Sequence, residues 1–388
     1  MKNKILHIVD DCLFLDSVIE LFEMVAPGRN IYLVNSPEPS NTKYSDKILA
    51  LSSGSVEYQR TINDTDCYCA VMIHALTYQK IQIVNKIDKQ VILVWFFWGA
   101  DGYYLKKLYS KAYSEKTKRC LNKIDNSNAY KKIKGLILSY DFFSIPFSLI
   151  KYHRLPEDYE RRLAIKRMNY CVPVIEDDYY LLKKNIRFCA QLINCNYGYI
   201  EKSTFGFQEN ISKEKFSVLV GNSGDPANNH FDILDALKEK NFDNNIISPL
   251  SYGNNDYIKH VVRYGKDLFG QQFIPLLDFI PLVEYNALVA NCSIVIMNHY
   301  IQQAMGNIIF TLWRGAKLFI NKKNTIYNFL KRNNAIFYTI EEDLSRPDAF
   351  TPLRDFEKEI NRKFINNCFS EKEILKRATL LVEKITKN

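Results

Sequence analysis

Hydrophobic residues occur along this chain in short continuous runs, and several runs are followed by segments with the 3.6-residue period of an amphipathic helix. Such runs predict strands buried on both faces, because helices cover both sides of a parallel sheet. In the first half, the predicted strands are Lys4–Val9, Asn30–Val34, Cys69–Ile73, Val91–Phe97 and Lys134–Leu138, with helices such as Phe14–Met24 and Tyr78–Asn85 between them. In the second half, the predicted strands are Ser217–Val220, Asn245–Pro249, Phe273–Leu276, Ser293–Met297 and Lys317–Ile320, with helices at Phe231–Lys240, Asn255–Phe269, Pro281–Ala290 and Asn307–Arg314.

This alternation predicts an α/β protein with two parallel sheets. We expect a first Rossmann-like domain over residues 1–205 and a second over residues 215–365, joined by the polar, glycine-containing stretch 196–215. The tail Glu371–Lys387 has the pattern of one amphipathic helix, and residues 366–388 are expected to pack back against the first domain. Two such domains facing each other across a cleft describe the GT-B architecture, which is the fold class that we predict.

Composition narrows the class of protein. The 388 residues are 47% hydrophobic and 24% charged, a globular balance with enough chain for two cores. Nine cysteines, with no Cys-x-x-Cys pair, argue against a disulfide scaffold or zinc ribbon and fit a reducing compartment. The N-terminus turns acidic too early for a signal peptide, and the longest apolar run, Val91–Ala100, is about half of a membrane span. A soluble or peripheral protein is expected.

The net charge of +9 is unevenly distributed. Between Tyr104 and Lys134 there are ten Lys or Arg residues against two acidic ones, and an aromatic-rich apolar stretch follows over residues 135–151. A basic segment beside an aromatic one favours attachment to an anionic membrane surface. The alternative is a solvated basic helix followed by a core strand. No nucleic-acid-binding module is recognisable, so nucleic acid is not an expected partner.

A loop of small polar residues follows the predicted strand Ser217–Val220 and leads into a helix. Its amides and the helix N-terminus offer a site for a phosphate or diphosphate, and its glycines let the backbone approach a ligand closely. The spacing matches neither the dinucleotide fingerprint nor the P-loop, and a plain turn followed by a helix cap is the alternative. The residues expected to bind a nucleotide diphosphate here are Gly221, Asn222, Ser223, Gly224, Asp225, Asn228 and His230.

Ligands of parallel sheets bind beyond the carboxyl ends of the strands, so the other strand-end loops of the second half are further candidates. Tyr252 could contact phosphate or sugar, and the backbone at Phe279 and Ile280 could pair with a pyrimidine base. The helix entry at Asn307 is a second potential diphosphate site. The candidates from these loops are Tyr252, Phe279, Ile280, His299, Gln302, Gln303, Gly306 and Asn307.

The motif Gly221–Pro226 with Asn228-Asn229-His230 resembles the signature of the 4-acetamido-4,6-dideoxygalactose (Fuc4NAc) transferases, which are bacterial enzymes. Segments Trp98–Asp101, Pro249–Gly253 and Gln302–Asn307 agree with it in order and kind, and the resemblance is continuous from about Ser217 to Ile320. It implies a dTDP-sugar donor, a polyprenyl-diphosphate-linked saccharide acceptor, and direct displacement with inversion at the anomeric carbon. No cofactor is implied. The ribose-holding Glu of many GT-B enzymes is absent, and Thr311 stands near its place.

Such a reaction calls for one base on the acceptor side. Asp101, in the matched Trp-Gly-Ala-Asp segment, is the first candidate and His74 the second; the pair Asp10-Asp11 is the third. His7 alternates with apolar neighbours and is expected in the core. Asp64-Thr65-Asp66 resembles the metal-binding Asp-x-Asp of GT-A transferases, but it precedes a strand and is interpreted as a turn. With no His/Cys cluster at ligand spacing, no metal is expected.

The leading hypothesis is a metal-independent, inverting glycosyltransferase at the cytoplasmic face of the bacterial inner membrane. It would transfer a deoxy-amino sugar during synthesis of a surface polysaccharide such as O-antigen, capsule or a related antigen. Two alternatives stay open: a two-domain sugar-nucleotide epimerase, and a non-catalytic scaffold that binds a nucleotide sugar. Inversion of the free donor at C2 would indicate the epimerase, and binding without turnover would indicate the scaffold.

Overall fold

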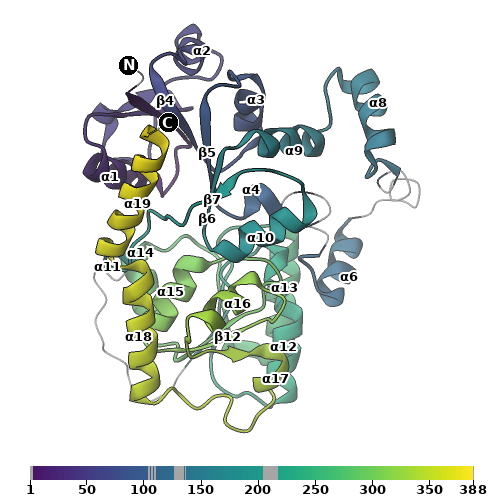
Figure 1. Cartoon of the computed structure of the whole chain (residues 1–388). Coiled ribbons are helices and arrows are strands. Elements are labelled where there is room, and N and C mark those ends of the chain that lie inside the picture. The colour runs from purple at the N-terminus through teal and green to yellow at the C-terminus, as the bar shows by residue number, and fades with distance from the viewer. Residues whose placement is uncertain are drawn as a thin grey trace. The chain divides into compact units, whose positions relative to one another are not determined.

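The computed structural model describes residues 3–103, 105, 108, 111–125, 135, 137–203 and 217–387. The chain forms two compact units (Figure 1). Unit 1 contains residues 1–109, 133–199 and 371–388, and unit 2 contains residues 110–132 and 200–370. The expected first domain spans residues 1–205, whereas the segment 110–132 falls in unit 2.

Unit 1 is built on a seven-stranded parallel sheet with the order β3-β2-β1-β4-β5-β6-β7. The strands are β1 (Lys4–Val9), β2 (Asn30–Val34), β3 (Ile48–Ala50), β4 (Tyr68–His74), β5 (Ile92–Phe97), β6 (Tyr170–Pro173) and β7 (Gln191–Leu192). β1 pairs with β2 on one side and with β4 on the other, so the strand order reverses between β1 and β4. In doubly wound sheets, this reversal opens a crevice where ligands bind.

The strand predicted at Lys134–Leu138 is wrong in its described part. Gly135 and Ile137 are helical and Leu138 lies in a turn. The Ile137 side chain is exposed rather than buried in a sheet, so the apolar run there marks a surface segment. The predicted linker 196–215 also begins too early, because Tyr197 is buried in the core of unit 1. Residues 204–216 lie outside the described part.

The C-terminal helix α19 (Glu371–Thr386) completes the core of unit 1. Ile374, Ala378, Leu381 and Ile385 recur at helical spacing, and all four are buried in the same cluster as the β1 and α1 (Leu15–Val25) residues. α1 and α19 pack against each other, the purple and yellow helices at the left of Figure 1. The amphipathic pattern of the tail therefore corresponds to a core helix.

Unit 2 contains a six-stranded parallel sheet with the order β10-β9-β8-β11-β12-β13. Its strands are β8 (Val218–Val220), β9 (Ile246–Pro249), β10 (Phe273–Leu276), β11 (Ile294–Met297), β12 (Lys317–Ile320) and β13 (Tyr338–Thr339). Here the order reverses between β8 and β11. The glycine-containing loop directly follows β8, so the fold places it at the reversal.

Helices surround both sheets. Those of unit 1 not yet named are α2 (Val56–Asn63), α3 (Tyr78–Lys86), α4 (Ala100–Tyr103), α8 (Asp141–Tyr152), α9 (Glu157–Arg167) and α10 (Glu176–Asn185). Those of unit 2 are α6 (Glu115–Ile124), α11 (Ile200–Ser203), α12 (His230–Glu239), α13 (Asn255–Phe269), α14 (Leu282–Ala290), α15 (Met305–Trp313), α16 (Thr325–Arg332), α17 (Ile340–Asp343) and α18 (Asp355–Phe369). Across the described ranges, no helix combines the length and the apolar character needed to cross a bilayer.

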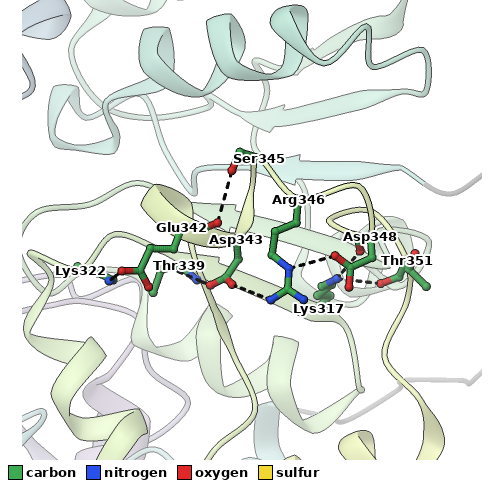
Figure 2. Close-up of polar contacts among 9 residues, drawn as sticks. All are labelled: Lys317, Lys322, Thr339, Glu342, Asp343, Ser345, Arg346, Asp348 and Thr351. Atoms are coloured by element: carbon green, nitrogen blue, oxygen red, sulfur yellow. Dashed lines mark hydrogen bonds and ion pairs between the residues drawn. The ribbon is translucent and has the colours of Figure 1, made fainter.

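A polar network fastens the β13 edge of unit 2 (Figure 2). Asp343 accepts hydrogen bonds from the amide and hydroxyl of Thr339 at 2.7 and 2.9 Å, and Arg346 joins Asp343 to Asp348. Lys317 donates to the carbonyls of Asp348 and Thr351 at 2.8 and 3.2 Å. Because Lys317 opens β12, this bond lies at the amino end of the strand, opposite the carboxyl ends of the strands, and stabilises the edge of the sheet.

Candidate functional site

The loop after β8 is closely packed onto the polar residues that follow it. Gly221 has φ +71°, and a Cβ there would lie 2.7 Å from Asn228 Oδ1 and 2.8 Å from His230 Nε2. Only glycine fits both this backbone conformation and this space. The Gly221 amide donates to the Ile296 carbonyl of β11 at 3.0 Å, which ties the loop to the neighbouring strand.

Asn228 organises the loop from a buried position. Its Oδ1 accepts from the Asn222 amide and faces His299 Nε2, both at 2.9 Å. Its Nδ2 donates to Ser223 Oγ and to the Asp225 carbonyl at 3.2 and 3.1 Å. The structure thus brings together five donor-site candidates from two neighbouring strand ends, β8 and β11.

The histidines of this cluster are neutral. Burial lowers the pKa of both His230 and His299 to about 3. His299 Nε2 faces two oxygen acceptors, those of Asn222 and Asn228, so this nitrogen carries the proton. Among the described residues, His299 Nδ1 and His230 Nε2 have no hydrogen-bond partner. The cluster therefore offers neutral imidazoles and amides.

A second loop is fastened to the first by a backbone bridge between two glycines. The Gly224 amide donates to the Tyr252 carbonyl at 2.7 Å, and the Asn254 amide donates to the Gly224 carbonyl at 3.1 Å. A Cβ on Gly253 would lie 2.2 Å from the Gly224 carbonyl carbon, so the backbones of the two loops are in close contact there. Asn222 donates to the hydroxyl of Tyr252, whose ring is largely exposed.

The remaining candidates of unit 2 vary in accessibility. Phe279 is exposed in the loop after β10, and Gln302 is buried, with no hydrogen-bond partner for its Oε1 within the described part of the chain. Gly306 and Asn307 lie in the first turn of α15, where a Cβ on Gly306 would meet open space. Thr311 is buried, and its hydroxyl donates to the Asn307 carbonyl at 2.6 Å. Ile280 and Gln303 are partly buried in the loops after β10 and β11.

The side chain of Asp225 takes part in a local turn. Its carboxylate accepts from the Ala227 amide at 2.7 Å and caps the short helix Pro226–Asn228. Burial raises the pKa of Asp225. The alternative interpretation of Asp225-Pro226 as a turn is therefore confirmed for this residue.

Asn229 links the loop to a distant segment, which sequence reasoning missed. This buried residue has φ +51°, and its Oδ1 accepts from the Ser114 amide at 2.8 Å. Its Nδ2 donates to the carbonyls of Ala112 and Asn298 at 3.1 and 3.0 Å. Nearby, Ser114 Oγ donates to Asp232 at 2.5 Å. Segment 111–125 thus braces the start of α12 within unit 2.

In unit 1, Asp101 is deeply anchored. Its Oδ2 accepts from the Leu76 amide and from Trp95 Nε1 at 2.8 and 2.7 Å, and Oδ1 accepts from the Trp98 amide at 3.0 Å. The residue is only 5% exposed, and burial raises the pKa of its carboxyl group. These contacts join the ends of β4 and β5. A catalytic role for Asp101 stays a prediction.

His74 is buried in the core of unit 1. Its Nε2 lies 3.1 Å from His7 Nδ1, and its ring stacks on Phe96 with centroids 4.6 Å apart. Burial, together with the neighbouring His7, holds the pKa of His74 well below its usual range. His7 is fully buried as expected, and burial lowers its pKa to about 3. Within unit 1, His74 has no exposed surface from which to act on a substrate.

The Asp64-Thr65-Asp66 motif lies in the turn between α2 and β4, as interpreted from the sequence. Cys67 Sγ donates to Asp64 at 3.4 Å, a local contact of that turn. Within the described ranges, no group of three His, Cys, Asp or Glu side chains is placed to hold a metal ion.

A family model described as 4-alpha-L-fucosyltransferase, glycosyl transferase group 56, matches residues 148–368, more than half of the chain. The chain belongs to this family. This group 56 protein is therefore a glycosyltransferase, and its resemblance to the Fuc4NAc transferases is confirmed at the level of the family. The match contains the whole Gly221–His230 loop.

Solved structures of other proteins share the fold of the group 56 chain. Sucrose-phosphate synthase from Thermosynechococcus elongatus has a TM-score of 0.66 at 10% identity over 99% of each chain. HepE from Anabaena in complex with UDP has a TM-score of 0.61 at 11% identity, over 99% of this chain and 100% of that one. The expected GT-B fold class is confirmed.

A UDP-N-acetylglucosamine 2-epimerase also matches, with a TM-score of 0.53 at 10% identity over 100% of this chain and 98% of that one. At such identities, the likeness shows the fold alone. The fold is therefore common to transferases and an epimerase, and it is the family match that distinguishes between them.

Proposed function

We propose that this group 56 protein transfers a deoxy-amino sugar of the Fuc4NAc type from a dTDP-linked donor to a polyprenyl-diphosphate-linked saccharide, with inversion and without a metal ion. The observation that carries the proposal is the neutral cluster around Asn228 and His299 at the strand-order reversal of unit 2. The transfer would serve synthesis of a bacterial surface polysaccharide. The resemblance described above supports the choice of donor and acceptor.

The cluster suits a leaving diphosphate. When the bond from the anomeric carbon to the donor oxygen breaks, negative charge grows on the nucleoside diphosphate, and fixed hydrogen-bond donors stabilise it. The amides of the Gly221–Gly224 loop and the neutral side chains beside it would supply such donors. The one carboxylate of this loop, that of Asp225, accepts from the Ala227 amide and caps its own turn. Phe279 and Tyr252 are exposed on neighbouring loops, where a base and sugar could contact them.

The decisive experiment incubates the full chain with a dTDP- or UDP-linked deoxy-amino sugar and a synthetic polyprenyl-diphosphate saccharide. We expect a product heavier by one sugar residue, with inverted anomeric configuration, at a rate unchanged by EDTA. C2 inversion of the free donor would indicate an epimerase, and donor binding without turnover would indicate a scaffold. Activity that disappears in EDTA and returns with manganese or magnesium would refute metal independence.

Peripheral attachment to the cytoplasmic face of the inner membrane is part of this proposal, and α8 of unit 1 supports it. The large apolar side chains of α8 point outward, with Phe142 83% and Ile150 79% exposed. The small Ser144 and Ser148 are the residues that α8 buries. An apolar stripe at helical spacing that faces solvent is typical of a helix that lies in a membrane interface.

The charges around α8 also fit an anionic surface. The one acidic residue of the helix, Asp141, is held by Arg162 through both carboxylate oxygens, at 2.9 and 2.5 Å. The exposed Lys151 and Arg154 follow at the C-terminal end. Of the predicted basic stretch, residues 111–125 belong to unit 2, whereas Lys106, Lys107, Lys131, Lys132 and Lys134 lie outside the described residues.

Liposome sedimentation tests the attachment. The double variant Phe142→Ser/Ile150→Ser should bind vesicles containing phosphatidylglycerol about a hundredfold more weakly, since each apolar side chain contributes about 1.5 kcal/mol or more when buried in lipid. The matched control Val56→Ser removes an exposed apolar residue of α2 and should bind like the wild type. Equal binding of the double variant and the wild type would place the attachment elsewhere.

A further inference from the structure

Asp10 lies at the strand-order reversal of unit 1. β1 ends at Val9 and β4 ends at His74, and these neighbouring strands continue into loops that lead to opposite sides of the sheet. In doubly wound sheets, the crevice at such a point takes the ligand. The loop after β1 begins with Asp10, continues through Asp11 and Cys12, and ends in the exposed Leu13 and Phe14.

Three carboxylates lie near this edge of the sheet, and they differ in the hydrogen bonds that they already accept. Both oxygens of Asp101 accept hydrogen bonds inside the core, as described above. Asp11 accepts from the amides of Ser40 and Asn41, each at 2.9 Å, and so fastens a neighbouring loop. Asp10 uses Oδ2 for Lys80 at 2.7 Å, while its Oδ1 has no hydrogen-bond partner among the described residues. Only Asp10 of the three combines an unoccupied oxygen with a side chain that is 35% exposed.

Lys80 fixes the position of Asp10. Its side chain is 3% exposed, and its ammonium group donates to Asp10 and to the His74 carbonyl, the latter at 2.5 Å. A buried ammonium group is costly unless it is paired, so this contact is part of the folded state of unit 1. The carboxylate is thus held at the end of β1 through Oδ2. A fixed, accessible carboxylate is what a general base requires.

The last residue of the same loop, Phe14, offers an apolar contact surface. Phe14 is half exposed and packs edge-on against Trp98, with ring centroids 5.1 Å apart, and Tyr197 supports both rings. The C–H face of a sugar ring packs well on such an aromatic group, and its hydroxyls are then left for polar neighbours. Phe14 and Asp10 belong to the same loop after β1, so an acceptor that packs on this aromatic group would contact the loop that carries Asp10.

We propose that Asp10 is the general base of the transfer and that Lys80 is its positioning residue. In the step, the acceptor hydroxyl oxygen forms a bond to the anomeric carbon while its proton passes to Asp10 Oδ1. The bond from that carbon to the donor phosphate breaks, and its electron pair leaves with the nucleoside diphosphate. This inference rests on the proposed function, because it requires a transferase that acts on an acceptor hydroxyl.

The test compares carboxylate variants of the full chain in the transfer assay defined above. Asp10→Asn should lower kcat by about 10² to 10⁴-fold, the usual contribution of a general base, with unchanged affinity for dTDP in calorimetry. The acid limb of the pH–rate profile should disappear in this variant. Lys80, Cys12 and Tyr58 are the other titratable groups that act on Asp10, and all three remain in it.

Two further variants separate a base from a structural residue. Asp66→Asn removes an exposed carboxylate from the turn before β4 and should behave like the wild type. Asp101→Asn should lower the melting temperature, because Asp101 holds the ends of β4 and β5 together. Should Asp10→Asn itself fail to fold, Asp10→Glu decides: a reduced kcat with a persistent acid limb supports the proposal, and an unchanged kcat overturns it.

The outcomes also separate this inference from the proposed function. If the wild type transfers sugar and folded Asp10→Asn keeps more than about a tenth of its kcat with the acid limb intact, Asp10 is not the base and the proposed function stands. If the wild type transfers no sugar to any polyprenyl-linked saccharide, the proposed function fails, and the role of Asp10 fails with it.

Discussion

Replacing Gly221 with Ala tests whether the loop after β8 is the donor site. The substitution has two separable effects. A side chain at φ +71° costs about 1–2 kcal/mol of backbone strain. The new Cβ would also lie 2.7 Å from Asn228 Oδ1 and must displace it. That oxygen is the acceptor for the Asn222 amide and for His299, and two such hydrogen bonds are worth about 2 kcal/mol together.

The strain should appear as a lower free energy of unfolding, and the loss of loop order as weaker dTDP binding. A loss of about 2 kcal/mol corresponds to about a 30-fold rise in the dTDP Kd. Gly28→Ala is the matched control, because Gly28 has φ +68° but open space around its Cβ. It should lose stability through strain alone and bind dTDP normally. If Gly221→Ala binds dTDP within threefold of the wild type in calorimetry, the loop does not hold the donor.

The other predictions concern single groups. Ser223→Ala should slow transfer by about 10²-fold by removing one hydrogen-bond donor to the leaving diphosphate, and normal steady-state kinetics would contradict that role. Leu381→Ala, in the buried face of α19, should cost unit 1 about 2–5 kcal/mol in urea denaturation and leave dTDP affinity unchanged. The free energy of unfolding should fall as the pH drops from 6.5 toward 3. Over this range His7, His230 and His299 bind protons in the unfolded state but stay neutral in the folded state, where their pKa values are lowered to about 3. The expected loss, on the order of 1 kcal/mol per pH unit for each histidine, is measurable by urea titration at pH 7 and pH 5.

The sequence predicts the central strands well because burial on both faces leaves an uninterrupted apolar run. β5, β8 and β11 all show this pattern. The shorter strands are missed: β7 and β13 have two residues each, too few for any periodicity. The opposite error occurs at Lys134–Leu138, where an apolar run is followed by a helix that exposes its large side chains.

The candidate donor site was predictable in part because its chemistry is local. The Gly221–His230 loop is one continuous motif, and the helix that follows gives it a recognisable context. Contacts between distant segments leave no such signal. Lys80 meets Asp10 from 70 residues away, and Ser114 meets Asn229 from 115 residues away. The sequence also does not reveal that Asp101 and His74 are buried, because a residue at the end of a strand can face either the core or the crevice.

The path of the chain between the units limits how this enzyme can be divided. Residues 110–132 leave the first half of the sequence to join unit 2, and residues 371–388 return to unit 1. A fragment cut at residues 200–370 would lack α6 and leave Asn229 without the Ser114 amide and the Ala112 carbonyl. Chimeras that exchange donor specificity at a single junction would therefore mismatch this brace. A recombinant donor half needs both pieces, with 110–132 joined to 200–370 as one polypeptide.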